Sequence, residues 1–393
     1  MTAMASLPHI FDLTRDQLIE RVTELGLPRY RAKQLLQWVY RRGVIEPGRM
    51  TDLSLADREV IAANFRFLDG RTLRHQSASD GTQKLLVDWS LPPNAPAAPA
   101  AGDRFDAAPD SNRGLPVLGQ AEAERGNPSD QTECVMIPAE SRSSGKVRRT
   151  ACISSQVGCP VGCRFCASGL GGLDRNLSAG QIVQQAWQLS HQLEGGPITN
   201  VVFMGMGEPL ANFSPVVQAI QTLAAEWGMN LSGRRITLST VGLPAQIRRL
   251  AELDLPFTLA ISLHAPDDEL RRQIIPWADF VSIDQLIDAG RYYFYRTGRE
   301  ITLEYILLGR VNDQPEHAKA LARVAKKLRS NVNLIRYNEV AGLPYERPRH
   351  DDVHRFQTLV QRAGITCHIR ASRGRDIDAA CGQLRHEQHA TSA

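Results

Sequence analysis

The sequence predicts an α/β protein, a partial (β/α) barrel preceded by a small helical unit. From residue 133 onward, short apolar segments rich in β-branched residues alternate with helical segments, which is typical of a parallel sheet covered by helices. Polar or Gly-rich segments follow several of these predicted strands, at the carboxyl ends where barrel enzymes carry their catalytic groups. Residues 12–67 instead show the apolar period of helices.

The predicted N-terminal unit contains two amphipathic helices in succession. Asp12 or Thr14 is placed to cap the first, which Gly26 and Pro28 end, and Gly43 stops the second. The pair is basic through Arg29, Arg31, Lys33, Arg41 and Arg42. Such a run of charge is either a solvated helix face or a platform for an RNA backbone, and the residues alone leave both interpretations open.

Residues 72–91 read as two strands around a turn at 79–81, and a change of composition follows. Residues 92–131 are rich in Pro, Ala, Gly and Asp without an apolar period, so we expect a disordered insertion with no catalytic role. The predicted organisation is a helical unit (1–70), a strand pair with the insertion (71–132), the barrel (133–380) and a tail that starts at Cys381 (381–393).

Composition limits the class of protein. The chain has 393 residues, of which 42% are hydrophobic, and a formal net charge of +4, which permits nucleic-acid binding without requiring it. Seven cysteines, three of them clustered, do not match a small secreted disulfide scaffold. We see no signal peptide and no apolar run long enough to span a membrane. We expect a cytoplasmic monomer that does not associate with membranes.

The barrel strands are expected at eight places, and helices at most of the intervals. Ser178, Ser214–Pro215 and Ser282 are placed to start three of those helices. The predicted strands span residues 133–137, 151–155, 198–204, 235–239, 257–262, 301–307, 332–337 and 366–371.

Cys159, Cys163 and Cys166 form a C-x3-C-x2-C run directly after the strand at 151–155. Iron–sulfur clusters are held by thiolates, usually four, so three ligands leave one iron of a 4Fe–4S cluster open to a substrate or cofactor. A structural zinc site is the alternative, but a closed site needs a fourth ligand. That ligand would be a His or one of the other cysteines, and spacing alone does not decide between the two metals.

Polar residues recur at the ends of later strands. Gly207 and Glu208 follow the strand at 198–204, where glycine lets the backbone approach a ligand and the carboxylate accepts hydrogen bonds. Ser239 ends one strand, Ser262-Leu263-His264 ends the next, and Asn338 follows the strand at 332–337. Each alone is as well explained by loop capping. Their recurrence at one end of successive strands favours a ligand site.

Two further cysteines are not explained by packing. Cys152 lies seven residues before Cys159, and Cys381 follows a charged segment near the C-terminus. Cys134 and Cys367 read as buried small hydrophobes. An accessible thiol in a mobile segment is a candidate nucleophile, which is our interpretation of Cys381.

Five segments together resemble the RlmN family of radical S-adenosylmethionine (SAM) RNA methyltransferases. They are CISSQVGCPVGCRFC, FMGMGEPL, RITLST, AISLHAP and DIDAACGQL, in that order, and the N-terminal LPRYRAKQLLQWVY is similar to the family's accessory RNA-binding domain. The resemblance implies a radical-SAM type of partial barrel. It also implies a 4Fe–4S cluster on Cys159, Cys163 and Cys166, and a SAM site formed by Gly207, Glu208, Ser239, Ser262, Leu263, His264 and Asn338.

The resemblance further implies methylation of adenine C2 in 23S rRNA and in tRNAs with two SAM molecules. One methylates Cys381, and the other yields a radical that activates the S-methyl group for addition to the base. Glu133 would accept a proton, and Cys152 would release the product by forming a disulfide with Cys381. A flavodoxin- or ferredoxin-type protein would supply electrons.

Two alternatives stay open: the related adenine-C8 methyltransferases with the same chemistry, and a zinc-stabilised RNA-binding protein without catalysis. The chain departs from the family's usual form in the 92–131 insertion, in a longer AESRSSGKVRR segment before Cys152, and around Asn338.

Overall fold

A computed structural model describes residues 7–91, 130–140, 145, 147–253 and 255–384. The predicted insertion therefore lies outside the described residues, except for its ends at 130–131, and so does most of the predicted tail. Within the described ranges, one ten-stranded sheet runs in the order β1-β2-β3-β4-β7-β8-β9-β10-β11-β12. The strands are β1 (Arg71–Ser77), β2 (Gln83–Asp88), β3 (Gln131–Glu140), β4 (Val147–Cys152), β7 (Asn200–Phe203), β8 (Ile236–Thr240), β9 (Thr258–Ser262), β10 (Ile301–Leu307), β11 (Ser330–Arg336) and β12 (Cys367–Arg370).

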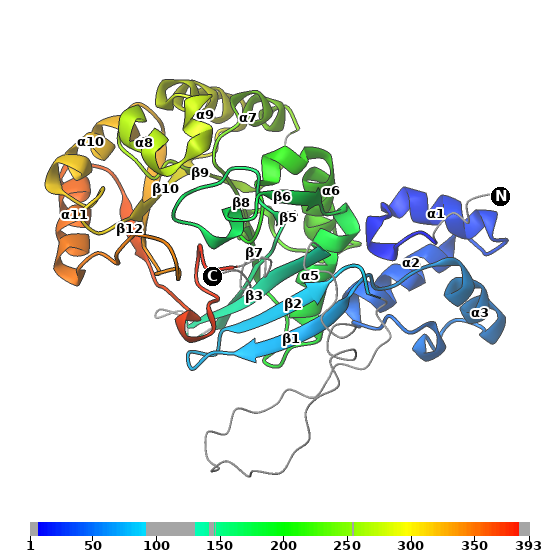
Figure 1. Ribbon diagram of the computed structural model, residues 1–393. Helices are drawn as coiled ribbons and strands as arrows, with labels where there is room; N and C mark the ends of the chain where they lie inside the picture. The colour runs from blue at the N-terminus through cyan, green and yellow to red at the C-terminus, as the bar shows by residue number, and fades with distance from the viewer. Residues whose placement is uncertain (1–6, 92–129, 141–144, 146, 254, 385–393) are drawn as a thin grey trace, which may run out of the picture.

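The sheet has an antiparallel and a parallel part that meet at β4. Strands β1 to β4 pair antiparallel, whereas β4 and the six strands that follow it in the sheet pair parallel. Helices connect the parallel strands and cover the outside of the curved sheet (Figure 1). They are α5 (Ala179–His191), α6 (Phe213–Ala224), α7 (Pro244–Ala251), α8 (Asp268–Ile274), α9 (Ile283–Thr297), α10 (Pro315–Ala325) and α11 (His350–Arg362). The predicted partial barrel is confirmed.

The strand predictions differ from the structure in two instructive ways. The segment at 133–137 lies within β3, which pairs antiparallel with both neighbours and so belongs to the extension and not to the parallel barrel. The segment at 151–155 is strand only as far as Cys152, although the Ile153 N–H still donates to the Val202 carbonyl of β7 at 3.0 Å. The apolar pattern is the same in both cases, and strand direction is set by partners distant in sequence.

The N-terminal unit is helical, as predicted. It comprises η1 (Ile10–Asp12), α1 (Arg15–Glu24), α2 (Tyr30–Leu36), the π-helical turn η2 (Gln37–Arg41), η3 (Pro47–Arg49) and α3 (Leu55–Asn64). Thr14 caps α1 in a capping box with Gln17. Gly43 ends the second helix at φ +65°, and a Cβ there would lie 2.4 Å from the ring of His191, so α5 packs directly against this turn.

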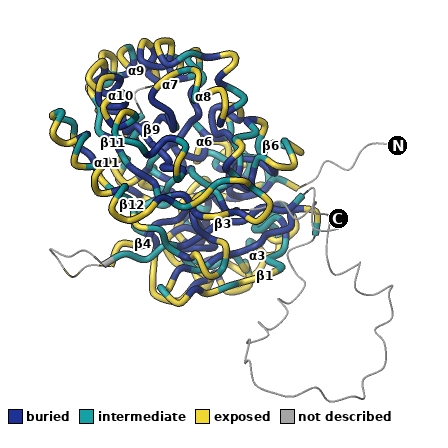
Figure 2. Tube along the Cα trace, turned by 60° about the vertical axis from the view of Figure 1, so that its left-hand side comes forward, coloured by how far each residue is buried: buried dark blue, intermediate teal, exposed yellow. Residues whose placement is uncertain are grey.

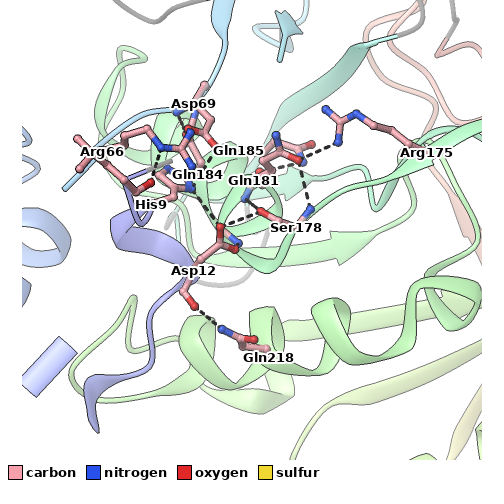
Figure 3. Close-up of polar contacts among 12 residues, drawn as sticks. His9, Asp12, Arg66, Asp69, Arg175, Ser178, Gln181, Gln184, Gln185 and Gln218 are labelled. Carbon is pink, nitrogen blue, oxygen red and sulfur yellow. Dashed lines mark hydrogen bonds and ion pairs between the residues drawn. The ribbon is translucent and has the colours of Figure 1, made fainter. Parts of the chain in front are cut away.

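Asp12 caps a helix of the barrel instead of its own unit. Its carboxylate accepts hydrogen bonds from the Gly180 backbone N–H and, at 3.2 Å, from the Ser178 hydroxyl at the start of α5 (Figure 3). Gln218 of α6 donates to the Asp12 carbonyl at 2.6 Å. One turn further along the same face of α5, Gln184 exchanges hydrogen bonds with the backbone of Asp69 at 2.6 and 2.7 Å. The helical unit is thus fixed to the barrel.

Residues 179–190 of helix α5 are all buried, since α5 packs against β3, α6 and the N-terminal η1. Figure 2 shows the buried parts of the chain gathered in the interior, with exposed residues along the outer helices. The Trp187 indole donates to the Val39 carbonyl across the contact with the N-terminal unit at 2.8 Å. A buried amide must find partners, and Gln185 of α5 exchanges hydrogen bonds with the backbone of Ser154 at 2.8 and 3.0 Å. These bonds fix the start of the loop that carries the clustered cysteines.

Candidate active site

The clustered cysteines lie in the loop between β4 and α5, at the carboxyl end of the parallel strands. A hydrogen bond holds this loop against the end of α8, with the Arg164 N–H donating to the Ile274 carbonyl at 3.0 Å. Phe165 is buried and meets the His264 ring edge-on, with 5.2 Å between ring centroids. Cys159, Cys163 and Cys166 all line one cavity, here called the upper cavity.

The surroundings of these thiols suit a cluster. Burial raises the pKa of Cys159 to about 12 and raises those of Cys163 and Cys166, although all three side chains are half-exposed to the cavity. Such thiols become thiolates when a metal binds them. In the part of the chain that is described, no three His, Cys, Asp or Glu side chains are arranged to hold a single metal ion. A 4Fe–4S cluster does not need its ligands around one point, because each thiolate binds a separate iron.

Five of the seven residues predicted for SAM line the same cavity: Gly207, Glu208, Ser239, Ser262 and His264. The two serine hydroxyls, at the ends of neighbouring strands β8 and β9, lie 3.3 Å apart. Gly207 has φ +101°, and a Cβ there would lie 2.7 Å from the Ser155 hydroxyl and from the Gln156 Cβ. The absence of a side chain therefore lets the loop after β7 pack against the segment after β4.

Glu208 lies in the loop after β7 and bonds to the end of the neighbouring strand β8. It is buried, and its carboxylate accepts hydrogen bonds from the Leu210 N–H at 2.9 Å, the Thr240 hydroxyl at 2.7 Å and the Val241 N–H at 2.7 Å. Burial raises the pKa of Glu208, and these three hydrogen bonds oppose that effect. The carboxylate thus fixes the cavity wall, while the side chain still faces the cavity.

His264 is held as a neutral imidazole. Burial and the nearby Arg271 lower the pKa of His264 to about 3. Its Nδ1 accepts a hydrogen bond from the Ile306 N–H at 3.1 Å, so the neutral ring carries its proton on Nε2. Its backbone has φ +60°, and Asn312 donates to its carbonyl at 2.9 Å. The neutral His264 ring is therefore fixed in the cavity wall, and its Nε2–H is the hydrogen-bond donor that it can offer.

Leu263 and Asn338 lie outside the upper cavity. Leu263 is buried, and its N–H donates to the Glu304 carbonyl at 3.0 Å, which are the features of a core residue. Asn338 lines a second cavity, here called the lumen cavity, and its amide donates to the Cys381 carbonyl at 3.3 Å. Its side chain therefore contacts the segment that carries Cys381, and its amide oxygen accepts a hydrogen bond from Arg347 at 3.0 Å.

The lumen cavity occupies the interior of the partial barrel and has a volume of about 480 Å³. It extends from the amino ends of the parallel strands, marked by Asn200 and Thr302, up to Cys381. Its wall is polar and basic, with Arg148, His368, Arg370 and Arg373 among the lining residues. Four residues line both cavities, which therefore meet there: Met204, Glu304, Ile335 and Cys381.

Cys381 is exposed and yet firmly positioned. The Ala167 N–H beside the cysteine loop donates to the Gly382 carbonyl at 2.8 Å, and the Ser168 hydroxyl donates to the Leu384 carbonyl at 2.8 Å. The β1–β2 turn holds the segment from the other side, since Asp376 accepts a hydrogen bond from the Ser79 N–H at 2.8 Å. The thiol is accessible, as we expected, but its segment is anchored at several points.

Cys152 and Glu133 lie beside this segment and line neither cavity. Cys152 is buried in an apolar cluster with Ala379 and Leu384 and is a free thiol. Burial raises its pKa to about 12, with a further contribution from the nearby Cys381. The Glu133 carboxylate pairs with Lys84 at 2.7 Å, and Lys84 also donates to the Asp378 carbonyl at 3.3 Å. Cys152 therefore contacts the Cys381 segment through Ala379 and Leu384, and Glu133 is connected to it through Lys84.

Three charged residues of the site escaped the sequence analysis. Arg271 is fully buried and donates to the carbonyls of the strand ends, including that of Val241 at 2.7 Å. Glu304 is a buried carboxylate where the two cavities meet, and Arg370 lies 3.6 Å from it. Glu304 had a usable signal, since it is the one charged residue in an apolar strand. Arg271 had none, because its segment reads as an exposed helix.

Two family models match the chain. Residues 153–323 match the radical SAM superfamily, and residues 9–66 match the ribosomal RNA large subunit methyltransferase N-terminal domain. Proteins named as probable dual-specificity RNA methyltransferases RlmN are similar over nearly the whole length. The one from Salinibacter ruber is 40% identical over 95% of this chain and 92% of its own, and the one from Thermosynechococcus vestitus is 41% identical over 92% and 94%. The chain belongs to the RlmN family of dual-specificity RNA methyltransferases.

The solved structure of a radical SAM methyltransferase from Sphaerobacter thermophilus agrees with this membership. It matches with a TM-score of 0.82 and 37% identity over 97% of this chain and all of its own. RlmN-family proteins are radical SAM enzymes, so the cofactors are a 4Fe–4S cluster and SAM. This membership decides against the zinc-stabilised RNA-binding protein. No helix among the described residues is long and apolar enough to cross a membrane.

Proposed function

We propose that this chain methylates C2 of an adenine in 23S rRNA and in tRNAs, with Cys381 as the methyl carrier. One observation carries the proposal: Cys381 lies where the upper cavity meets the lumen cavity. A thiol in this position can take a methyl group from a ligand on one side and pass carbon to a base on the other. Adenine C2 is electrophilic, so a simple methyl-cation transfer does not suffice.

Cys159, Cys163 and Cys166 would hold the cluster, and the strand-end residues of the upper cavity would hold SAM. The bound cofactors would supply a methyl group and, after reduction, a radical that removes hydrogen from a methyl group. Ser239 and Ser262 offer hydroxyls to the ribose or carboxylate of SAM, and His264 offers Nε2–H. Gly207 and Glu208 shape the wall against which the ligand would lie.

Cys381 would act first as a nucleophile. Its thiolate would attack the methyl carbon of the SAM sulfonium, so a C–S bond would form at Cys381, the bond from that carbon to the SAM sulfur would break, and S-adenosylhomocysteine would leave. Although Cys381 is accessible from the cavities, the protein atoms around it keep much of the water away and raise the pKa of the thiol to about 11, and Arg370 opposes this rise. Arg370 would therefore favour the reactive thiolate.

Cys152 would release the product. After hydrogen removal, the carbon on Cys381 would bond to C2. Loss of one electron to a one-electron acceptor, such as the oxidised cluster, and of the C2 proton would restore the aromatic ring. The Cys152 thiolate would then attack the Cys381 sulfur, which would form a disulfide and break the bond from sulfur to carbon. The released carbon would keep the electron pair of that bond and take up a proton, which makes it the methyl group. A two-electron reductant regenerates both thiols. We propose that Glu133 accepts the C2 proton. Its ion pair with Lys84, which donates to the Asp378 carbonyl, connects it to the segment that carries Cys381.

The lumen cavity is the proposed route of the target nucleotide. Its mouth at the amino ends of the strands carries Arg148, and Arg370 lies near its inner end beside Glu304. Guanidinium groups suit phosphates, and the Thr and Asn side chains between them suit the edges of a base. An adenine taken out of an RNA stack would reach Cys381 by this path.

The remaining partners follow from this chemistry. We infer that a flavodoxin- or ferredoxin-type protein delivers electrons, and that the enzyme works as a monomer in the cytoplasm, where its RNA substrates are. The predicted domain limits at residues 70, 132 and 380 stay proposals, although the sheet continues without a break from β1 to β12.

Mass spectrometry of nucleosides tests the proposed function. The reconstituted enzyme is incubated with SAM, a reductant and either 23S rRNA or tRNA, and the RNA is digested. We expect 2-methyladenosine from both RNAs, and none from Cys381→Ala protein that still cleaves SAM reductively. 8-Methyladenosine would assign the chain the C8 reaction, and unmodified adenosine with active SAM cleavage would refute the proposal.

A further inference from the structure

A buried carboxylate lies where the upper cavity meets the lumen cavity, and the chemistry proposed above gives it no role. Glu304 belongs to β10 and is 2% exposed. Of the four described residues that line both cavities it is the acidic one, beside Met204, Ile335 and Cys381. Glutamate is almost never fully buried unless a partner holds it. Its place beside the methyl carrier therefore indicates a function beyond packing.

One oxygen of this carboxylate lacks a donor. Oε1 accepts a hydrogen bond from the Asn333 amide at 3.1 Å, and Asn333 is the register partner of Glu304 on β11. Oε2 is buried and has no hydrogen-bond partner among the described residues. The Arg370 guanidinium forms an ion pair with it at 3.6 Å, which is too long for a hydrogen bond. A ligand that donates to Oε2 would remove the cost of this unmade bond.

The carboxylate belongs to the lumen side of this junction. Its two partners, Asn333 and Arg370, both line the lumen cavity, and neither lines the upper cavity. Thr302, two residues before Glu304 on the same face of β10, also lines the lumen cavity alone. The last torsion of a glutamate is soft, so the group can turn either oxygen toward a ligand. On this side the proposed ligand is the target base, whereas SAM would lie in the upper cavity.

The chemistry of adenine restricts what this carboxylate can bind. An ionised carboxylate only accepts hydrogen bonds, and the one donor group on the edges of an adenine base is the 6-amino group. C2 and C6 flank N1 in the same ring, so a base whose C2 meets the Cys381 sulfur carries its 6-amino group across one ring from that atom. Met204 and Ile335 offer apolar surface to the ring faces at this point.

We propose that Glu304 accepts a hydrogen bond from the 6-amino group of the target adenine and so determines which base is methylated. This inference rests on the proposed function and adds a specificity-determining residue to it. A base with a carbonyl oxygen at position 6, such as hypoxanthine, places an acceptor against the carboxylate and is rejected. A purine without a substituent at position 6 leaves the carboxylate without its donor and binds less well.

A double-mutant cycle between enzyme and RNA tests this proposal. The full-length, cluster-loaded enzyme receives RNA with adenosine or purine riboside at the methylated position, and kcat/KM is measured for each from the methylated nucleoside. We expect the preference for adenosine to be about tenfold or more greater in the wild type than in Glu304→Ala protein, as for other hydrogen bonds to charged groups. The intrinsic reactivity of each base cancels between the two enzymes, and a general loss of activity cancels between the two RNAs.

Glu304→Gln keeps the shape of the side chain and offers a donor in place of an acceptor. Its amide can donate to O6 of an inosine at the methylated position, so the preference for adenosine over inosine should fall about tenfold or more from that of the wild type. Asp313→Asn makes the same chemical change at a buried carboxylate that lines neither of the two cavities. This control should keep both wild-type preferences.

The outcomes separate this inference from the proposed function. Wild-type preferences in the Glu304 variants, or wild-type methylation of inosine as fast as of adenosine, would overturn the role of Glu304, while 2-methyladenosine from the wild type would still support the proposed function. A wild type that forms no 2-methyladenosine would refute the proposed function, and this inference with it.

Discussion

At the residue scale, the account depends on one thiol that faces two cavities. Cys381 comes from the end of the chain and Cys152 from the end of β4, and the apolar cluster with Ala379 brings the two segments together. The raised pKa values of both thiols mean that they are mostly protonated at neutral pH in this structure. Their reactivity must therefore depend on neighbouring charges and on changes that accompany ligand binding.

Removing Cys152 should trap the reaction. In Cys152→Ala protein no thiol resolves the bond between Cys381 and the base, so we expect covalently attached RNA to accumulate at Cys381. Denaturing electrophoresis and peptide mass spectrometry would detect the adduct. Cys134→Ala is the matched control, because Cys134 is a buried thiol on the neighbouring strand. Free, fully methylated RNA from Cys152→Ala would refute the resolving role.

Removing Arg370 should slow reactions of the Cys381 thiol. Arg370 lowers the pKa of Cys381 and of Cys152, and Glu304 acts in the opposite direction on Cys381. In Arg370→Gln protein the thiol pKa should rise, so alkylation of Cys381 by iodoacetamide at pH 8 should be roughly three- to tenfold slower. Arg373→Gln, which changes a cation on the same lumen wall, should have a smaller effect. Equal rates in wild type and Arg370→Gln would contradict this role.

The sequence predicted those site residues that belong to a pattern within one short segment. The cysteine run and the polar strand ends are patterns within short segments, and five of the seven predicted SAM residues do line the upper cavity. Leu263 and Asn338 do not, because which side chains of a strand end face the cavity depends on the neighbouring strands. Arg271 and Arg370 act through contacts with distant segments, which no local pattern encodes.

At the scale of elements, hydrogen-bonded caps decide how the pieces fit. Ser178 and Ser282 cap α5 and α9 as predicted, each in a capping box. Helix α6 instead starts at Phe213, one residue before the predicted Ser214. Asp12 was a candidate cap for α1 and in fact caps α5. A side chain can cap any helix start that the fold brings near, so sequence position alone does not identify its partner.

Asp12 should therefore stabilise the contact between the N-terminal unit and the barrel. Loss of this cap in Asp12→Ala should cost about 1 kcal/mol and increase hydrogen exchange in residues 9–66. Glu20→Ala, an exposed change on α1, is the control. Burial raises the pKa of Asp12, but the His9 ring at 3.8 Å and hydrogen bonds from Gly180 and Ser178 outweigh it and leave the pKa below 3.8.

The sign of the pH dependence follows from this lowered pKa. The Asp12 contribution is fully present above pH 3.8 and is lost as the pH falls through the lower, folded-state pKa. The difference in melting temperature between wild type and Asp12→Ala should thus be constant from pH 5 to 8 and shrink only in strong acid. A difference that varies between pH 5 and 8, or none at all, would contradict the capping role.

At the scale of the whole molecule, the antiparallel extension positions the C-terminal segment. The β1–β2 turn bonds to residues 374 and 376 through Asp80 and Ser79, and Lys84 of β2 reaches Asp378. The alternation of strands and helices predicted the parallel part of the sheet from the sequence. It did not reveal that β1 to β3 continue the same sheet, because antiparallel pairing across a long insertion leaves no periodic signal.

The central claim is that Cys381 carries the methyl group from SAM to RNA, and a pulse–chase measurement tests it most directly. The enzyme is loaded with SAM labelled in its methyl group, freed of excess, and then given RNA, reductant and unlabelled SAM for one turnover. We predict label on the Cys381 peptide after the pulse and in 2-methyladenosine after the chase. Label that never appears on Cys381, or RNA that takes its methyl group only from the unlabelled SAM, would contradict the account.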